Sequence, residues 1–279
     1  MKTAEKPLTT PDRRQRVQAA ETGFAVLKGL ARLGGSASLT ALASHVNENP
    51  AKVHRYLASL IEEELVIQDP ESQQYRLGMQ AMFIGLSAMR QSDPIRLGEP
   101  ALIRLRENLE VTCFIAVMGN KGPVIVRFEE PSLPVTVNVR VGSVLPLLTS
   151  ATGRVFLGLQ NDRQVKLLAQ EEMEKAAISP NTEKVTDLDS FITQLRDEVQ
   201  KRHCAIVKDT NLRGISAVAA PVYNYAGQLC AVITALGATG GFDASVNGEI
   251  SRRVQEEARL VSAELGYVGM GSGGSGINA

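Results

Sequence analysis

Long apolar runs are missing from this sequence: none approaches the ~18 residues that a membrane-spanning helix needs. The first residues are polar and charged and contain no apolar core of a secretory signal, so we expect no signal peptide and a cytoplasmic protein. With 44% hydrophobic and 22% charged residues, the composition is that of an ordinary globular protein. The 279 residues are enough for two domains.

Cysteine is scarce, and its spacing excludes the common metal and disulfide frameworks. Cys113, Cys204 and Cys230 lie far apart in apolar surroundings, and no CxxC pair occurs. The sequence also has no HExxH motif and no cluster of cysteine and histidine. We therefore expect buried thiols in a reducing compartment, with no metal and no cofactor.

The usual motifs of catalysis are missing as well. There is no nucleophile elbow, no paired histidine and acid, and no phosphate loop with its lysine. The letters GMGSGG at 269–274 match the pattern GxGxxG, but they follow an expected helix and only five residues come after them. Because no βαβ unit fits there, we interpret residues 268–279 as a flexible tail.

The charges are unevenly distributed, although the formal net charge is zero. Residues 1–60 carry nine cations and four acids, an excess of five positive charges, and Glu62-Glu63-Glu64 then reverses the sign. A basic N-terminal part suits a polyanionic partner, although an ordinary solvated surface gives the same pattern.

A helix with two different faces is predicted at residues 50–63. Asn49 is a good N-cap, and Pro50 suits the first turn, where no intrahelical N–H bond is lost. His54 lies at the edge of the apolar face and is expected to be packed or half-buried. At ~3.6 residues per turn the apolar face holds Val53, Leu57, Leu60 and Ile61, and the opposite face holds Lys52, Arg55, Tyr56 and Ser59.

The segments around this helix predict a winged helix-turn-helix domain at residues 13–78. Residues 13–33 predict a helix that ends at Gly34-Gly35, and Thr40 is expected to cap a short second helix. Two β-prone runs, 65–68 and 74–77, flank a turn and form the wing. The apolar stripe of the first helix consists of Val17, Ala20, Phe24, Leu27 and Ala31. Residues 1–12 are expected to form a disordered arm.

In such a domain the helix at 50–63 enters the major groove of DNA. Arg55 suits guanine or phosphate, while Tyr56 and Ser59 suit the DNA backbone. The acidic tip of the wing argues against close phosphate contact there, which leaves Arg76 and the basic arm as phosphate candidates. The candidate DNA-binding residues are Asn49, Lys52, Arg55, Tyr56, Ser59, Arg76, Arg13, Arg14 and Arg16.

Residues 79–92 predict a linker helix, and residues 93–267 predict a second domain. The apolar side of the linker, Met79, Met82, Phe83, Leu86 and Met89, has no partner in the small first domain and is expected to be an intersubunit surface. The second domain is predicted to be α+β. Helix is expected throughout 79–110, with a break at the Asp93-Pro94 cap. The expected strands of the second domain are 112–119, 123–130 and 135–142, and its hairpin joins 215–223 to 228–237. Its further helices are expected at 148–159, 186–202 and 243–266.

Several ordered pieces of residues 16–266 resemble the IclR family of bacterial transcription regulators. They are VHRYLASLIEEELV, YRLG, VGSVLPLLTSATGRVFLGL and GISAVAAPVYNYAGQLCAVITALG. The resemblance implies a winged DNA-binding domain, a linker helix that helps dimerise, and a GAF-like effector domain with an antiparallel sheet flanked by helices. Two departures stand out. Ala51-Lys52 occupies the place where the family often has Ser-Thr, and the matching pocket positions Val207, Ala217, Thr234 and Leu236 are mostly apolar.

The stretch LTSATGRVF predicts where an effector would bind. Thr149 or Ser150 is expected to cap a helix whose first amides suit a carboxylate. A plain capped helix on a sheet explains these residues equally well, and the resemblance favours the effector site. Because most candidates are apolar, we expect an aromatic or medium acyl acid in preference to glyoxylate or pyruvate. The candidates are Met118, Leu147, Ser150, Ala151, Thr152, Gly153, Val207, Ile215, Ala217, Thr234 and Leu236.

These observations predict a ligand-responsive transcription regulator that is not an enzyme. It is expected to bind double-stranded operator DNA as a homodimer or tetramer under the control of a small organic acid. The alternative is an enzyme that acts on a small organic acid and uses the winged domain for docking. A third possibility is a regulator whose pocket binds nothing.

Overall fold

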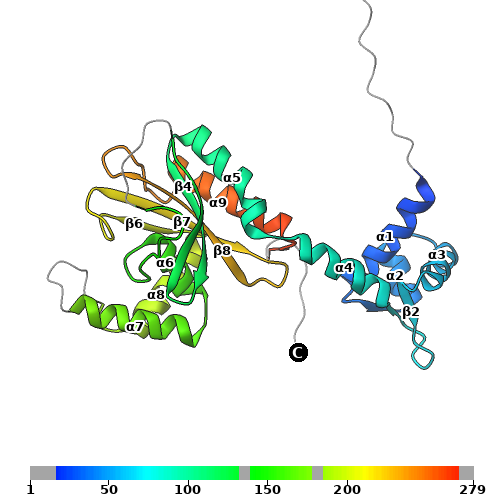
Figure 1. Ribbon diagram of the computed structural model, residues 1–279. Helices are drawn as coiled ribbons and strands as arrows, with labels where there is room; N and C mark the ends of the chain where they lie inside the picture. The colour runs from blue at the N-terminus through cyan, green and yellow to red at the C-terminus, as the bar shows by residue number, and fades with distance from the viewer. Residues whose placement is uncertain (1–16, 132–138, 178–184, 270–279) are drawn as a thin grey trace, which may run out of the picture. The chain divides into compact units, whose positions relative to one another are not determined.

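The computed structural model describes residues 17–131, 139–177 and 185–269 (Figure 1). The chain forms two compact units that divide between Gln91 and Ser92. The first unit is helical with a small sheet, and the second is built on a larger antiparallel sheet. The predicted α+β fold is confirmed.

The first unit is a winged helix-turn-helix. Its sheet has the order β1-β3-β2, with β3 paired antiparallel to both neighbours. The elements are α1 (Gln18–Arg32), β1 (Ser36–Ala37), α2 (Leu39–His45), α3 (Pro50–Glu62), β2 (Val66–Gln68), β3 (Tyr75–Leu77) and α4 (Met79–Gln91). Strand β1 was not predicted, because two residues leave no periodicity to detect.

The predicted apolar stripe of α1 is wrong except at Leu27, which is half-buried and packs against the core. Val17 and Phe24 are 65% and 59% exposed, whereas Val26 and Leu30 are fully buried. Gly29 explains the difference. A Cβ there would lie 2.6 Å from Val46 Cγ1, so the absence of a side chain lets α1 approach α2 on this side. A glycine adds nothing to a hydrophobic pattern, and the pattern therefore indicated the wrong face.

The cap of α2 also corrects the sequence analysis. Ser38, not Thr40, is the N-cap, and its Oγ accepts a hydrogen bond from the Ala41 amide at 3.2 Å. A serine, threonine, aspartate or asparagine can cap wherever the backbone enters the helix, so the composition alone does not choose between two neighbours. The predicted stop after α1 is confirmed, because Gly34 and Gly35 both have φ near +84°.

The second unit is a five-stranded antiparallel sheet with helices on both faces (Figure 1). The sheet order is β5-β4-β8-β7-β6. The strands are β4 (Thr112–Gly119), β5 (Gly122–Glu129), β6 (Ala205–Lys208), β7 (Ile215–Tyr223) and β8 (Leu229–Ala238). The helices are α5 (Pro94–Leu109), α6 (Ala151–Leu159), α7 (Arg163–Ala177), α8 (Leu188–Arg202) and α9 (Glu249–Glu264).

The two faces of the sheet enclose separate hydrophobic cores. One core joins the sheet to α6, α7 and α8, and the other joins it to α5 and α9. Successive residues of a strand point to opposite faces, so Thr234 and Leu236 face α6 while Ile233 and Ala235 face α5 and α9. This alternation decides which side chains can form a site beneath α6.

Two predictions for the second unit need correction. The strand predicted at 135–142 lies partly outside the described residues, and 139–142 are not strand. The last helix begins at Glu249 instead of 243, because Asp243 Oδ1 accepts from the Ser245 amide and holds a turn there. Helix α6 agrees with the prediction that Thr149 or Ser150 caps it, since Ser150 is its N-cap and the helix begins at Ala151. Helix α7 and strand β6 were not predicted.

Candidate functional site

The exposed side of α3 is a candidate surface for contact with a partner. Asn49 Oδ1 accepts from the Ala51 amide at 2.8 Å and starts the helix as predicted. Val53, Leu57 and Leu60 are buried. Residues advance by ~100° along a helix, so Arg55 lies near the middle of the opposite side, where it is exposed.

Several predicted residues of α3 are less free than the sequence suggests. Lys52 Nζ lies 2.8 Å from Glu48 Oε1, so an acid already balances its charge. Tyr56 is half-buried and packs against the core beside Gly23 of α1. Ser59 is exposed and its Oγ donates to the Arg55 carbonyl at 3.4 Å. Arg55 is thus the central cation of this side of α3.

His54 is more exposed than the sequence predicted. The residue was expected to be packed or half-buried, but the structure shows it exposed. The buried stripe of α3 is narrow, since only Val53, Leu57 and Leu60 are buried. A narrow stripe leaves the residue next to it in solvent, and His54 therefore joins Arg55 on the surface.

The wing carries a tightly held turn with an acid at its base. Asp69 Oδ1 accepts from the amides of Glu71 at 3.1 Å and Ser72 at 2.8 Å, and from Ser72 Oγ. The hydrogen bonds from Ser72 lower the pKa of Asp69, and the nearby Arg76 adds to that effect. Arg76 NH2 lies 3.9 Å from Asp69 Oδ2, so this candidate faces an acid. Arg13, Arg14 and Arg16 lie outside the described residues.

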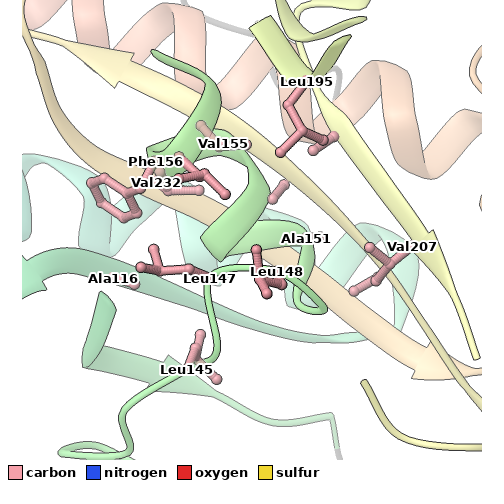
Figure 2. Close-up of a cluster of buried hydrophobic side chains, with 14 of the residues drawn as sticks. Ala116, Leu145, Leu147, Leu148, Ala151, Val155, Phe156, Leu195, Val207 and Val232 are labelled. Carbon is pink, nitrogen blue, oxygen red and sulfur yellow. The ribbon is translucent and has the colours of Figure 1, made fainter. Parts of the chain in front are cut away.

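A pocket lies between the sheet of the second unit and the N-terminus of α6. It contains about 420 Å³ of empty space, part of it open to solvent, and the centre of a water molecule can occupy about 40 Å³ there. Figure 2 shows Ala151 at the start of α6, with Leu145, Leu147 and Leu148 on the segment that leads into it. The lining residues are Phe114, Val139, Leu145, Ser150, Ala151, Thr152, Val207, Asn211, Leu212, Ile215, Ala217, Thr234 and Leu236.

Two rows of the sheet form the floor of the pocket. Thr234 pairs with Phe114 on β4. One row further along, Leu236 pairs with Ala217, which in turn pairs with Val207. Four different strands thus bring their side chains to one face, and no single stretch of sequence contains the site.

Eight of the eleven predicted pocket residues line the pocket, and three do not. Leu147 is 2% exposed and belongs to the core, where it packs with α6. Gly153 faces the preceding segment, since a Cβ there would lie 2.6 Å from Leu147 Cα. Met118 packs at the edge of the same core. Five further residues line the pocket and were not predicted: Phe114, Val139, Leu145, Asn211 and Leu212.

The polar groups of the pocket are few and uncharged. Ser150 Oγ donates to the Pro146 carbonyl at 2.6 Å and accepts from the Gly153 amide at 2.9 Å. The N-cap hydrogen bond therefore occupies the third amide of α6, that of Gly153. The amides of Ala151 and Thr152 belong to the same first turn of α6. Among the described lining residues none has a charged side chain. Such a site is suited to an anion held by neutral donors.

Two further hydrogen bonds close the pocket. Thr152 Oγ1 and Thr234 Oγ1 lie 2.8 Å apart, and both residues are buried. At the rim, Thr149 Oγ1 donates to Asn211 Oδ1 at 3.4 Å. Asn211 was missed because it lies in the turn between β6 and β7, and β6 was not predicted.

The remaining surface gives no sign of metal or membrane binding within the described ranges. Over residues 17–131, 139–177 and 185–269, no group of three histidine, cysteine or acidic side chains is placed to hold a metal ion. None of the helices there has the length and apolar character needed to cross a bilayer.

Comparison with known proteins agrees with this architecture. The family model described as the bacterial transcriptional regulator IclR C-terminal domain matches residues 87–263, and the IclR helix-turn-helix domain matches residues 19–70. The transcriptional repressor AllR of Klebsiella pneumoniae is 25% identical over 257 residues, which cover 92% of this chain and 93% of AllR. The probable transcriptional regulator SauR of Cupriavidus necator is 25% identical over 216 residues, or 77% of this chain and 84% of SauR.

A solved structure is similar over nearly the whole length. The crystal structure of Pseudomonas aeruginosa HmgR superposes with a TM-score of 0.80 at 36% sequence identity, covering 91% of this chain and all of HmgR. The matched families and relatives are transcription regulators, so the alternative of an enzyme is set aside. The chain belongs to the IclR family, as a transcription regulator with a helix-turn-helix DNA-binding domain and an IclR effector domain.

Proposed function

We propose that this chain binds double-stranded operator DNA through α3, as a homodimer or tetramer in the cytoplasm. We also propose that a small organic acid of aromatic type controls this binding from the pocket beneath α6. The observation that carries the proposal is the exposed side of α3 in a winged helix-turn-helix, with Arg55 near its middle.

Recognition of DNA would use α3 in the major groove, whose width of ~12 Å admits a helix. Arg55 can form a pair of hydrogen bonds with guanine, and Ser59 and the amide group of Asn49 suit contacts at the ends of the helix. Lys52 and Arg76 would have to exchange Glu48 and Asp69 for phosphate. The arginines at 13, 14 and 16 remain proposed phosphate contacts.

Assembly would use the apolar side of α4. Met79, Met82 and Phe83 are 50–56% exposed, and Leu86 and Met89 are each 39% exposed. An apolar surface of this kind along one helix usually marks an interaction site. A two-fold dimer would present two copies of α3 to two half-sites of an operator.

The acid would place its carboxylate at the N-terminus of α6. The amides of Ala151 and Thr152 and the hydroxyl pair Thr152–Thr234 supply donors, while Phe114 and Leu236 supply apolar walls. A small oxoacid has little apolar surface to bury and needs more donors than this lining offers. An aromatic acid suits both parts of the pocket.

Control of DNA binding would follow if the acid binds one arrangement of the protein more tightly than another. The acid shifts the population toward the arrangement that binds it more tightly, and the affinity for the operator changes with that population. The coupling works in both directions, so operator DNA must change the affinity for the acid by the same factor.

The test is a binding titration with the full chain. Duplexes selected in vitro from fragments of the source genome are titrated at two salt concentrations beside a random duplex of equal length. 4-Hydroxybenzoate and pyruvate are then added separately. We expect tight, salt-dependent binding to the selected duplex and a change with 4-hydroxybenzoate alone. A response to pyruvate alone would overturn the aromatic assignment, and equal binding to both duplexes would overturn operator recognition.

A further inference from the structure

Glu172 on α7 makes an unusual contact with the backbone of a distant loop. Its carboxylate accepts from the amide of Leu147 at 2.7 Å and from the amide of Leu148 at 3.2 Å, one with each oxygen. Both leucines are buried, at 2% and 4% exposure, and neither lies in a helix or strand. Without the carboxylate, two adjacent N–H groups would be buried without a partner, which costs ~1–3 kcal/mol each.

The loop that Glu172 holds forms one wall of the pocket. Leu145 lines the pocket two residues before the contact, and Ser150 lines it two residues after. The Leu145 amide donates to the Pro123 carbonyl at 2.8 Å, which fixes the beginning of the loop to β5. The position of residues 146–149 therefore sets both the rim of the pocket and the place where α6 begins.

Helix α6 holds the same loop from its other side. Arg154 Nε donates to the Leu148 carbonyl at 2.9 Å, and its guanidinium lies 5.6 Å from the ring centre of Phe191 on α8. Ser150 Oγ donates to the Pro146 carbonyl at 2.6 Å. The carbonyls of Pro146 and Leu148 are thus bound by the N-cap and the first turn of α6, and the amides of Leu147 and Leu148 are bound by Glu172 of α7.

A carboxylate suits this place better than an amide of the same shape. Two oxygens can each accept one N–H, and a charged acceptor forms the stronger hydrogen bonds. In a glutamine the second position is an NH2 group, which would face the N–H of the backbone instead of accepting from it. Burial raises the pKa of Glu172, while the hydrogen bonds from Leu147 and Leu148 lower it.

We propose that Glu172 is the positioning residue of the pocket, holding residues 145–150 so that the first turn of α6 is correctly placed for the acid. The proposal rests on the function proposed above, and it assigns a role to a residue outside the lining.

The first test measures amide hydrogen exchange by mass spectrometry on the full chain without ligand. The variants are Glu172→Gln and a matched control, Glu174→Gln, which makes the same change at an exposed position two residues further along α7. We expect Glu172→Gln to speed exchange in peptides that cover 145–153 and to leave the peptides of α9 unchanged. The control should match the natural protein throughout.

The second test measures binding of 4-hydroxybenzoate by calorimetry. Glu172→Gln should weaken binding about tenfold, as expected for losing one charge-assisted hydrogen bond beneath the site. Urea unfolding followed by the tyrosines of the second unit shows whether the variant is folded under the same conditions. Glu174→Gln should bind as the natural protein does.

The two tests separate the inference from the function on which it rests. Unchanged exchange in 145–153, or exchange that rises equally across the whole domain, overturns the role of Glu172 whatever the ligand result. Unchanged affinity in Glu172→Gln, when the natural protein binds the probe, overturns it as well. If the natural protein does not bind 4-hydroxybenzoate, the proposed aromatic effector is wrong, and the exchange result alone then decides the role of Glu172.

Discussion

The hydroxyl oxygens of Thr152 and Thr234 lie 2.8 Å apart and join the first turn of α6 to β8. Both residues are 1% exposed and line the pocket. Since one hydroxyl donates to the other, one O–H of the two is left for another acceptor. The pair therefore ties the roof of the pocket to its floor and can also offer a donor to a ligand.

Removing both hydroxyls of this pair should cost less stability than the sum of the two single removals. Thr234→Val leaves Thr152 buried without its partner, and we expect the free energy of unfolding to fall by ~1–3 kcal/mol. The double variant Thr152→Val/Thr234→Val removes both polar groups at nearly constant shape. Its loss should be clearly smaller than the sum of the two single losses, as measured by urea unfolding. Additive losses would show that the two hydroxyls do not depend on each other.

The close contact of Gly153 with the preceding loop predicts a large effect of a small substitution. A Cβ at this position would meet the backbone of Pro146 and lie 2.6 Å from Leu147 Cα. Backbone cannot rotate away as a side chain can, so Gly153→Ala should lower the free energy of unfolding by more than ~1 kcal/mol.

Gly85 in α4 provides the matched control for this substitution. Nothing lies within 4 Å of a Cβ built there, so Gly85→Ala should stabilise the helix by ~0.5–1 kcal/mol. Thermal unfolding of both variants gives the comparison. If the two alanines had the same effect, the packing of α6 against the loop would not be as tight as the structure shows.

The sequence predicted α3 well because residues close to the helix in sequence determine where it begins and which side is buried. Asn49 and Pro50 determine where the helix begins, and its buried residues follow the helical period without interruption. In α1 the same reasoning predicted the wrong buried face. Gly29 lies close to the end of α2 there, and it has no side chain to contribute to the hydrophobic pattern. The absence of a side chain is what lets α1 approach α2 at this position, and a pattern of apolar side chains does not reveal such an approach.

The pocket could be predicted only in part, for a different reason. Ser150 and Thr152 were found from a helix cap, and Thr234 from the family resemblance. Phe114 was missed because its place depends on the register between β4 and β8. Glu172 was missed because its contact with Leu147 spans 25 residues of sequence, beyond any local pattern.

The exposed apolar side of α4 predicts that assembly depends on it. Replacing Phe83 and Leu86, which are 51% and 39% exposed, with glutamate places charges on the proposed contact surface. We expect the double variant to sediment as a monomer and to lose operator affinity, because each half-site then binds independently. Ala88→Glu, an exposed change on the opposite side of the same helix, should keep the natural assembly. A double variant with unchanged assembly would place the interface elsewhere.

Arg55 should be the most important side chain of α3 for sequence recognition. Arg55→Ala is expected to weaken binding to a selected operator by ~1–3 kcal/mol and to affect a random duplex much less. Arg32→Ala, an exposed cation on α1, serves as the control for the loss of one positive charge. Equal losses on both duplexes would make Arg55 a phosphate contact.

The proposed function has two parts: α3 recognises DNA, and an acid in the pocket controls this recognition. Fluorescence anisotropy of a selected operator duplex and a random duplex, titrated with the full chain with and without 4-hydroxybenzoate, tests both halves together. We predict operator binding at least ~10³-fold tighter than random binding. The acid should change operator affinity ~5- to 150-fold. Equal affinity for both duplexes, unaffected by the acid, would contradict the account.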